Sequence, residues 1–292
     1  SIAAQDIVQS VRRIQEPYKK ANRKVHPDDT VIDLGGGAVI GGGRFGVIAG
    51  PCSVESAEQF DEVAECIADL GLTWIRGGAF KPRTNPHSFQ GLGEEALKIM
   101  KSAGDKYGLK TLTEVMDSAH CQLVADYVDG LQVGARNFQN FSLLKKIGEG
   151  TADTHQMVLY KRGFAGTIAE WLAATDYITD HGNTNVVLCE RGIRTFETAT
   201  RFTLDIAAVP VIHKQSLYPV CIDVSHPAGQ RDLVPSLAKA AIAAGADSLM
   251  IEVHPNPPVA LSDGPQQLTP AQFRELIAEL RELAACLGKK IV

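Results

Sequence analysis

The 292-residue chain lacks the features that mark several broad classes of protein. No apolar run approaches the roughly 20 residues that span a bilayer, and residues 1–30 are polar and basic, unlike a signal peptide. The six cysteines show no CxxC spacing, which favours a reducing compartment. The net charge of −5 argues against binding to nucleic acid or to an anionic membrane. We therefore expect a globular cytoplasmic protein.

Two nucleotide-binding signatures are also absent. Glycines crowd at positions 35–37 and 41–43, but no helix with Lys-Ser or Lys-Thr follows them, as a P-loop requires. The turn after the first long apolar run reads Gly-Pro-Cys-Ser, residues 50–53, rather than GxGxxG. We instead interpret the short apolar runs at 30–34 and 38–40 as a hairpin that covers one end of the main domain.

From residue 45 onward, short apolar runs alternate with segments that have helical character. Eight runs are expected to be strands: residues 45–49, 73–76, 110–114, 130–133, 157–161, 185–189, 220–224 and 248–252. The expected helices include residues 57–70, 94–107, 118–127, 167–179, 195–207, 233–244 and 272–287. Eight strand–helix units with right-handed crossovers in about 240 residues fit a closed (β/α)8 TIM barrel better than a large doubly wound sheet.

The fold class we expect is therefore α/β, in two unequal parts. Residues 1–44 form an N-terminal extension, with a short amphipathic helix over residues 5–22 and the hairpin. Residues 45–292 form the catalytic (β/α)8 barrel.

Cys52 directly follows the first strand-like run, so its thiol lies at the carboxyl end of a strand, where barrels build their sites. A cysteine alone is more often a small buried hydrophobe, so its interpretation depends on its companions. Other strand ends and the last loop carry His226, Glu252 and Asp263. One sulfur, one nitrogen and two oxygens suit Mn, Fe, Co or Zn more than Ca or Mg. The spacing leaves open whether Glu252 or His254 is the ligand, since both lie on the same strand face.

Seven cationic side chains gather at four of the strand ends. They are Arg76, Lys81, Arg83, Arg136, Lys161, Arg162 and Arg191. Like charges in one cleft repel each other unless an anion fills it, and arginine suits bidentate binding of phosphate or carboxylate. For Arg162 a solvated surface position stays open, because its neighbour Lys161 would point the other way along a strand. The set predicts a site for several anionic groups, such as two phosphates and a carboxylate.

Eight segments, taken in order, resemble 3-deoxy-D-arabino-heptulosonate 7-phosphate (DAHP) synthase, in particular its short microbial type I (beta) subfamily. The segments are residues 49–53 (AGPCS), 76–84 (RGGAFKPRT), 132–137 (QVGARN), 161–163 (KRG), 189–192 (CERG), 223–227 (DVSHP), 251–255 (IEVHP) and 262–264 (SDG). The resemblance runs from about residue 5 to the end of the sequence. It implies a TIM barrel that condenses phosphoenolpyruvate with erythrose 4-phosphate and water to DAHP and phosphate, the first step of the shikimate pathway.

The resemblance also implies roles for particular residues. It implies that Cys52, His226, Glu252 and Asp263 are the metal ligands, which selects Glu252 over His254. The implied phosphoenolpyruvate contacts are Arg76, Lys81, Glu114, Gly134, Ala135, Arg136, Lys161 and Arg191, and the implied erythrose 4-phosphate contacts are Pro82, Arg83 and Thr84. We expect Lys161, His226 and Cys52 to be catalytic. The expected metal is Mn2+, with Fe2+, Co2+, Zn2+ or Cd2+ as alternatives, and the expected assembly is a homodimer or homotetramer.

Other functions remain open beside this one. A sister family makes 3-deoxy-manno-octulosonate 8-phosphate from arabinose 5-phosphate. It typically has Lys-Ala-Asn-Arg-Ser-Ser where this chain has Lys-Pro-Arg-Thr at residues 81–84, which favours the four-carbon sugar. A metal-dependent hydrolase would not need seven converging cations, and a non-catalytic sugar-phosphate binding protein would not need both sets of residues.

Relatives often carry an N-terminal regulatory domain. The roughly 45 residues before the barrel are too few for one, so we expect an unregulated enzyme or a chain trimmed to its core.

Overall fold

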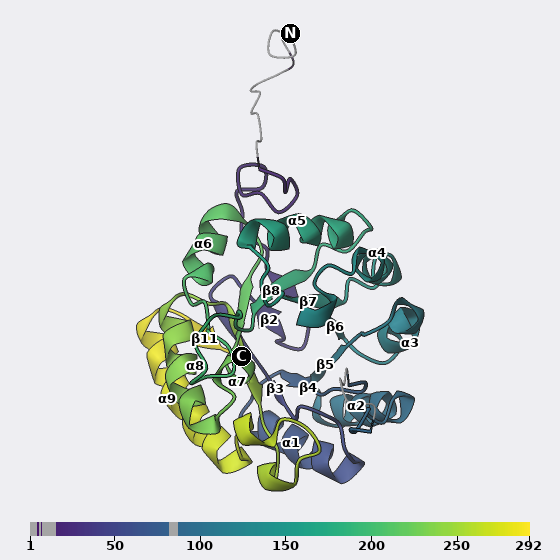
Figure 1. The fold of residues 1–292 in the computed structure, drawn as a ribbon, viewed down its shortest axis with the longest axis vertical. Helices are drawn as coiled ribbons and strands as arrows, with labels where there is room; N and C mark the ends of the chain where they lie inside the picture. The colour runs from purple at the N-terminus through teal and green to yellow at the C-terminus, as the bar shows by residue number, and fades with distance from the viewer. Residues whose placement is uncertain (1–4, 6, 8–15, 82–86) are drawn as a thin grey trace.

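Eight parallel strands form a closed barrel in the computed structural model, which describes residues 5, 7, 16–81 and 87–292 (Figure 1). They are β3 (Arg44–Gly50), β4 (Trp74–Arg76), β5 (Lys110–Glu114), β6 (Gly130–Val133), β7 (Met157–Lys161), β8 (Val186–Glu190), β9 (Val220–Asp223) and β10 (Ser248–Glu252). Each strand pairs with the next, and β10 closes the barrel against β3, with Ser248 opposite Gly46 and Glu252 opposite Gly50. The closure confirms the predicted (β/α)8 TIM barrel.

Helices follow the strands along the chain, and the longer ones lie around the outside of the barrel (Figure 1). They are α1 (Ala57–Asp69), α2 (Glu94–Tyr107), α3 (Cys121–Ala125), α4 (Phe141–Gly150), α5 (Ile168–Thr179), α6 (Ala208–Gln215), α7 (Ser225–Ala228), α8 (Val234–Ala243) and α9 (Pro270–Cys286). Local sequence fixes where some begin. Thr167 and Thr269 form capping boxes with Glu170 and Gln272, which satisfy amide groups at the first turns of α5 and α9.

The predicted hairpin is confirmed and closes one end of the barrel. β1 (Ile32–Asp33) and β2 (Val39–Ile40) pair in antiparallel fashion. The buried side chain of Ile40 joins the same core cluster as Trp74 and other residues on barrel strands. Gly46, near the start of β3, leaves room for it, because a Cβ there would lie 2.7 Å from Ile40 Cγ1. The hairpin therefore packs against the barrel where its strands begin.

The predicted helix over residues 195–207 is wrong. These residues form a loop with an antiparallel bridge between Ile193 and Thr203, and α6 begins only at Ala208. Threonines stand at positions 195, 198, 200 and 203, and β-branched side chains lose χ1 freedom in a helix. The loop reaches the end of the barrel that carries the predicted site residues.

Both ends of the chain depart from the simple barrel. Half of the expected helix over residues 5–22, namely residues 6 and 8–15, lies outside the described residues. Its described part, residues 16–22, forms turns and an isolated bridge from Asn22 to Ser216 rather than a helix. At the other end, β11 (Lys290–Ile291), which we did not predict, pairs in parallel with the start of β3.

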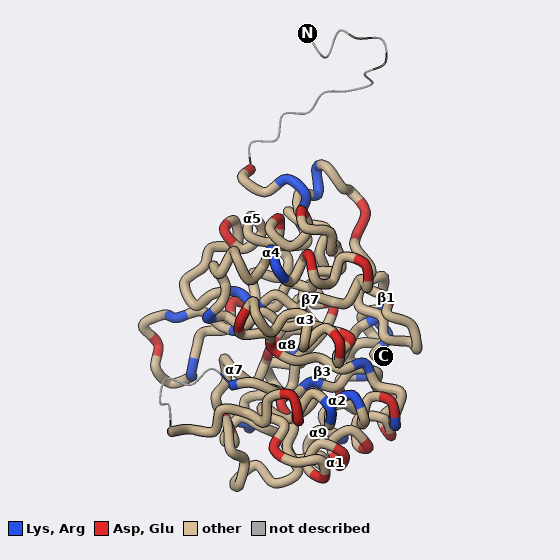
Figure 2. The backbone as a smooth tube through the Cα atoms, turned by 90° about the vertical axis from the view of Figure 1, so that its right-hand side faces the viewer, with Lys and Arg blue, Asp and Glu red and all other residues tan. Residues whose placement is uncertain are grey.

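Charge is spread over the outer surface. Lysine and arginine (blue) and aspartate and glutamate (red) are scattered along the tube in Figure 2, and α1 carries acidic residues without a lysine or arginine. Among the described residues, none of the helices has the length and apolar character required to span a bilayer.

Candidate active site

The carboxyl ends of the barrel strands surround a pocket. Its lining residues are Arg76, Lys81, Glu114, Gln132, Gly134, Ala135, Arg136, Lys161, Phe164, Arg191, Arg201, Phe202, His226 and Asp263. The structure thus brings together all eight residues that we expected to contact phosphoenolpyruvate. The other predicted contacts, Pro82, Arg83 and Thr84, lie outside the described residues. Sequence reasoning missed Gln132, Phe164, Arg201 and Phe202 as members of this site.

The four predicted metal ligands converge at one side of the pocket. Ligand atoms of Cys52, Glu252 and Asp263 all lie within 4.8 Å of one another, and Cys52 Sγ is 3.7 Å from Asp263 Oδ2. His226 Nε2 lies 3.6 Å from Glu252 Oε1 and 3.8 Å from Asp263 Oδ2. A thiol, an imidazole and two carboxylates therefore share one small volume, which fits a divalent transition metal.

His254 has other partners. Its Nε2 lies 3.3 Å from Glu55 Oε2, and its Nδ1 accepts a hydrogen bond from the Asn256 amide. The carboxylate of Glu252 belongs to the cluster instead. The geometry therefore agrees with the choice of Glu252 that the resemblance implied.

Asp223, at the end of β9, is a buried carboxylate to which sequence reasoning gave no role. Its Oδ2 accepts a hydrogen bond from Lys161 Nζ at 2.7 Å and lies 2.6 Å from His226 Nδ1. Its Oδ1 accepts from the amides of Ser225 and His226. With Nδ1 engaged by Asp223, His226 directs Nε2 toward Glu252, an arrangement typical of histidines that bind metals. The sequence signal that could have revealed this role of Asp223 is an aspartate three residues before a histidine at a strand end.

The Asp223 contacts set the charge states of its neighbours. Burial alone would lower the pKa of Lys161, but the negative charge of Asp223 opposes this, and the pKa lies above its ordinary value. Burial alone would raise the pKa of Asp223, yet His226 and Lys161 hold it well below its ordinary value. Burial lowers the pKa of His226 in spite of Asp223. At neutral pH, Lys161 is therefore charged and His226 is a neutral imidazole.

Three of the proposed metal ligands already carry a cationic partner from the protein. The pairs are Lys81 Nζ with Cys52 Sγ (3.0 Å), Arg76 Nη1 with Glu252 Oε1 (3.1 Å), and Arg201 Nη1 with Asp263 Oδ2 (3.2 Å). Burial and the charge of Glu252 raise the pKa of the Cys52 thiol. Burial would raise the pKa of Asp263, but His226 and Arg201 lower it to about 2.

Arg191 packs against two aromatic rings that also line the pocket. Its guanidinium carbon is 4.1 Å from the ring centroid of Phe202 and 4.9 Å from that of Phe164, within cation–π range. The two rings stack, with their centroids 5.2 Å apart. Arg191 Nη1 is buried and makes no hydrogen bond to any described residue. This donor is left available to an anion in the pocket.

Arg162 belongs to a different cluster. Its Nη1 donates to Glu190 Oε2 at 2.9 Å and to Asp205 Oδ2 at 2.7 Å, and its Nε donates to Gly166 O. It is buried, so it is not the solvated surface charge considered from the sequence, and it is not among the residues that line the pocket. The prediction that it joins the cationic set at the mouth is wrong, because it lies on the other face of the strand from Lys161.

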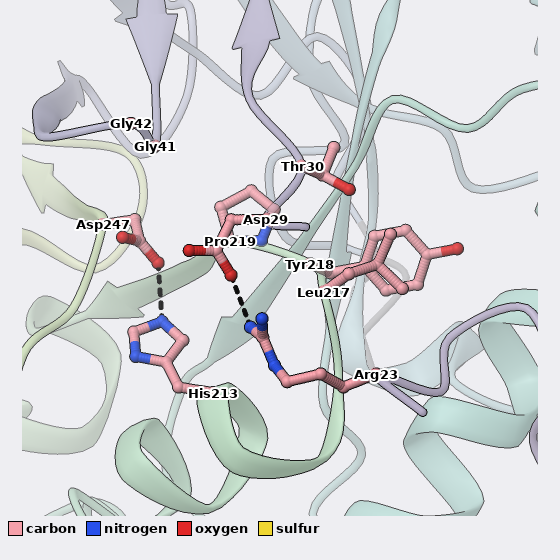
Figure 3. A pocket seen from close by; sticks show the side chains of 10 residues that line it. All are labelled: Arg23, Asp29, Thr30, Gly41, Gly42, His213, Leu217, Tyr218, Pro219 and Asp247. Carbon is pink, nitrogen blue, oxygen red and sulfur yellow. Dashed lines mark hydrogen bonds and ion pairs between the residues drawn. The ribbon is translucent and has the colours of Figure 1, made fainter. Parts of the chain in front are cut away.

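A second pocket lies where the strands begin (Figure 3). Among its lining residues, Pro219 and Asp247 directly precede β9 and β10. Its charged groups pair with one another: Arg23 with Asp29, and His213 with Asp247 at 2.8 Å. This pocket therefore holds no excess of lysine and arginine over aspartate and glutamate, whereas the pocket at the strand ends does. The latter is therefore the candidate active site.

Comparison with known proteins identifies the family of the chain. A family model described as the DAHP synthetase I family matches residues 24–287. A phospho-2-dehydro-3-deoxyheptonate aldolase of Thermotoga maritima is 52% identical over 286 residues, which cover 98% of this chain and 83% of that protein. A 2-dehydro-3-deoxyphosphooctonate aldolase of Caulobacter vibrioides is 32% identical, covering 82% of this chain and 87% of that protein.

Solved structures give the same result. The crystal structure of the phospho-2-dehydro-3-deoxyheptonate aldolase (DAHP synthase) of Thermotoga maritima matches with a TM-score of 0.92 and 52% identity, over 99% of this chain and 83% of that one. A truncated form of 3-deoxy-D-arabino-heptulosonate 7-phosphate synthase from Thermotoga maritima matches with a TM-score of 0.87 and 48% identity. That match covers 94% of this chain and 100% of the truncated one.

Proposed function

The chain belongs to the DAHP synthetase I family, and we propose that it is a DAHP synthase. It condenses phosphoenolpyruvate with erythrose 4-phosphate and water to give DAHP and phosphate, the first step of the shikimate pathway. The observation that carries this function is a strand-end pocket in which an anion-binding set of cations lies beside a Cys-His-Glu-Asp cluster. Identity of 52% to a heptonate aldolase, against 32% to an octonate aldolase, favours the four-carbon acceptor.

The cationic side of the pocket binds phosphoenolpyruvate. Arg136, Lys161 and Arg191 hold its phosphate and carboxylate, so their work is positioning and electrostatic stabilisation. The unpaired Nη1 of Arg191 is one donor for these anionic groups. Arg76 and Lys81 complete this side of the pocket.

Cys52, His226, Glu252 and Asp263 hold a divalent metal ion, with Mn2+ as our first choice and Fe2+, Co2+, Zn2+ or Cd2+ as alternatives. When bound there, the ion supplies Lewis acidity toward the aldehyde oxygen of erythrose 4-phosphate. Asp223 keeps the imidazole of His226 oriented through the 2.6 Å contact with Nδ1. Pro82, Arg83 and Thr84 are the proposed contacts of the sugar phosphate, as the sequence resemblance implies.

The reaction begins when C3 of phosphoenolpyruvate attacks the aldehyde carbon and forms the new carbon–carbon bond. Positive charge develops at C2, where water adds, and the resulting phosphohemiketal expels phosphate. Lys161 remains charged during these steps because Asp223 lies 2.7 Å from its ammonium group. It therefore stabilises the negative charge of the phosphate that is leaving.

The decisive experiment measures phosphate release from phosphoenolpyruvate plus erythrose 4-phosphate, with and without Mn2+ after treatment with a chelator. We expect release to require both substrates and the metal. Faster turnover with arabinose 5-phosphate would favour the octulosonate synthase instead. Release from a single phosphomonoester, without a second substrate, would favour a hydrolase.

We also infer a homodimer or homotetramer in the cytoplasm. Light scattering coupled to size exclusion would measure the assembly directly. A monomer at micromolar concentration would contradict this part of the proposal.

A further inference from the structure

Arg201 links two of the proposed metal ligands. Its Nη1 lies 3.2 Å from Asp263 Oδ2 and donates to Gln266 Oε1 at 2.9 Å. Gln266 Nε2 in turn donates to Glu252 Oε2 at 2.6 Å. One guanidinium is thus paired directly with one carboxylate of the cluster and connected through an amide to the other.

The loop before α6 holds the backbone of Arg201 in place. The Phe202 amide donates to Pro227 O at 3.1 Å, and the Ile193–Thr203 bridge closes the loop. Gly229 allows the approach, because a Cβ on this residue would lie 2.8 Å from Arg201 Cβ. The position of Arg201 beside Asp263 is therefore built into the fold.

The side chain of Arg201 is nevertheless less enclosed than that of another cation in the site. It is 38% exposed, whereas that of Arg76, which pairs with Glu252, is only 6% exposed. Arg201 also lines the pocket that contains Arg191 and Phe202. Arg201 therefore borders both Asp263 and the space proposed for the anionic substrate.

We propose that Arg201 is an exchangeable counter-ion of the metal site. Its guanidinium, which pairs with Asp263, competes with a divalent cation for this carboxylate and, once displaced, is offered to the anionic substrate. The second half of this exchange rests on the proposed function, because it assumes that phosphoenolpyruvate occupies the pocket. The first half concerns the metal alone.

Two consequences follow from the exchange. A cation that binds Asp263 must displace Arg201, so removal of the guanidinium should tighten metal binding when no substrate is present. In the native protein, metal and phosphoenolpyruvate should each strengthen the binding of the other, because the metal frees Arg201 for the substrate. The Arg201 variant should lose part of this mutual strengthening.

The test is a calorimetric titration of chelator-treated protein with Mn2+. For Arg201→Gln we expect a dissociation constant about twofold to fivefold lower than for the native protein, the range of a half-exposed ion pair. Arg201→Lys, which keeps the charge on a different side chain, should fall between the two. The matched control is Arg231→Gln, because Arg231 Nη2 donates to Gly264 O, next to Asp263, without pairing with the carboxylate.

An unchanged or weaker affinity for Mn2+ in Arg201→Gln would overturn the proposal. Equal tightening in Arg231→Gln would do so too, since it would reduce the effect to general electrostatics. The same titration with saturating phosphoenolpyruvate tests the second half. We expect this substrate to lower the dissociation constant for Mn2+ by a smaller factor in Arg201→Gln than in the native protein. If phosphoenolpyruvate changes Mn2+ affinity to the same extent in both proteins, or in neither, the substrate half fails. The phosphate-release assay still decides the proposed function, and the metal-only titration still decides the first half.

Discussion

Asp223 connects two side chains to which we assign separate roles. Through one oxygen it contacts both the ammonium group of Lys161 and Nδ1 of His226. The carboxylate therefore keeps the lysine charged on the side that we propose for phosphate and fixes the imidazole on the side that we propose for the metal. A single buried residue couples the two halves of the site.

The variant Asp223→Asn tests whether Asp223 acts on catalysis and metal binding or only on the stability of the fold. We expect kcat to fall about 10- to 100-fold and Mn2+ affinity to weaken, as is usual when the partner of a ligating histidine is lost. Steady-state kinetics and a metal titration would measure both. The matched control is Asp247→Asn, since Asp247 accepts hydrogen bonds from His213 and the Val220 amide at the opposite end of the barrel.

The control should lose thermal stability while the kcat of its folded fraction stays unchanged. An equal fall in kcat for both variants would mean that Asp223 acts only through stability. Native Mn2+ affinity in Asp223→Asn would remove the orienting role assigned to it.

At the scale of elements, the strands could be predicted from the sequence, but the loop before α6 could not. Strands buried on both faces read as continuous apolar runs, so β5, β6, β7 and β10 begin and end where predicted. The loop is instead fixed by contacts to distant residues, such as the Arg194 amide with Phe164 O and the Phe202 amide with Pro227 O. No local pattern encodes such contacts, and Arg201 and Phe202 were therefore missed.

Phe202→Ala tests the contribution of this loop to substrate binding. Loss of the ring removes the cation–π contact that helps to hold Arg191, so we expect KM for phosphoenolpyruvate to rise about twofold to thirtyfold. Initial rates at varied phosphoenolpyruvate give the value. Phe196→Ala is the control, because Phe196 lies in the same loop but is 97% exposed. A similar rise in both variants would indicate general loosening of the loop.

The packing of the hairpin against the barrel leads to a prediction about the free energy of unfolding. Ile40→Ala should cost about 2–5 kcal/mol through lost burial and the cavity left behind. Gly46→Ala should also destabilise the protein, because its new methyl group would meet Ile40 Cγ1 at 2.7 Å. The double variant should be less destabilised than the sum, with a coupling of about 0.5–3 kcal/mol. Denaturant unfolding measures each value, and strict additivity would show that the two sites do not touch in solution.

At the scale of the whole molecule, the sequence predicts which charges reach the mouth of the barrel but not how they pair. We expected the cations to be balanced by substrate. In the structure, buried carboxylates balance several of them: Arg76 pairs with Glu252 and Lys161 with Asp223. These pairs join strands that are far apart in sequence and depend on barrel closure. They could only be identified once the fold was known.

Metal binding by the folded protein should depend on pH through Cys52. The thiol must lose its proton to bind a cation, and burial raises its pKa. His226, with a lowered pKa, and Asp263, with a pKa of about 2, are already unprotonated near neutral pH. The apparent dissociation constant for Mn2+ should therefore fall by about tenfold per pH unit between roughly pH 6.5 and 8.

Titrations in buffers with different heats of ionisation would count the proton released, and we expect about one. In Cys52→Ala this dependence should disappear, and in Cys66→Ala, which removes another buried thiol, it should persist. A constant affinity across the same pH range in the native protein would show that Cys52 is not a ligand.

The pairing of β10 with β3 has a consequence for synthesis on the ribosome. These strands are separated by about 200 residues, so at about 5–20 residues per second β3 waits roughly 10–40 s for its second neighbour. Throughout that interval one edge of an apolar strand lacks its partner, and such edges recruit other chains. Nascent chains should therefore depend on chaperones until β10 emerges, and slower translation should lengthen that period of risk.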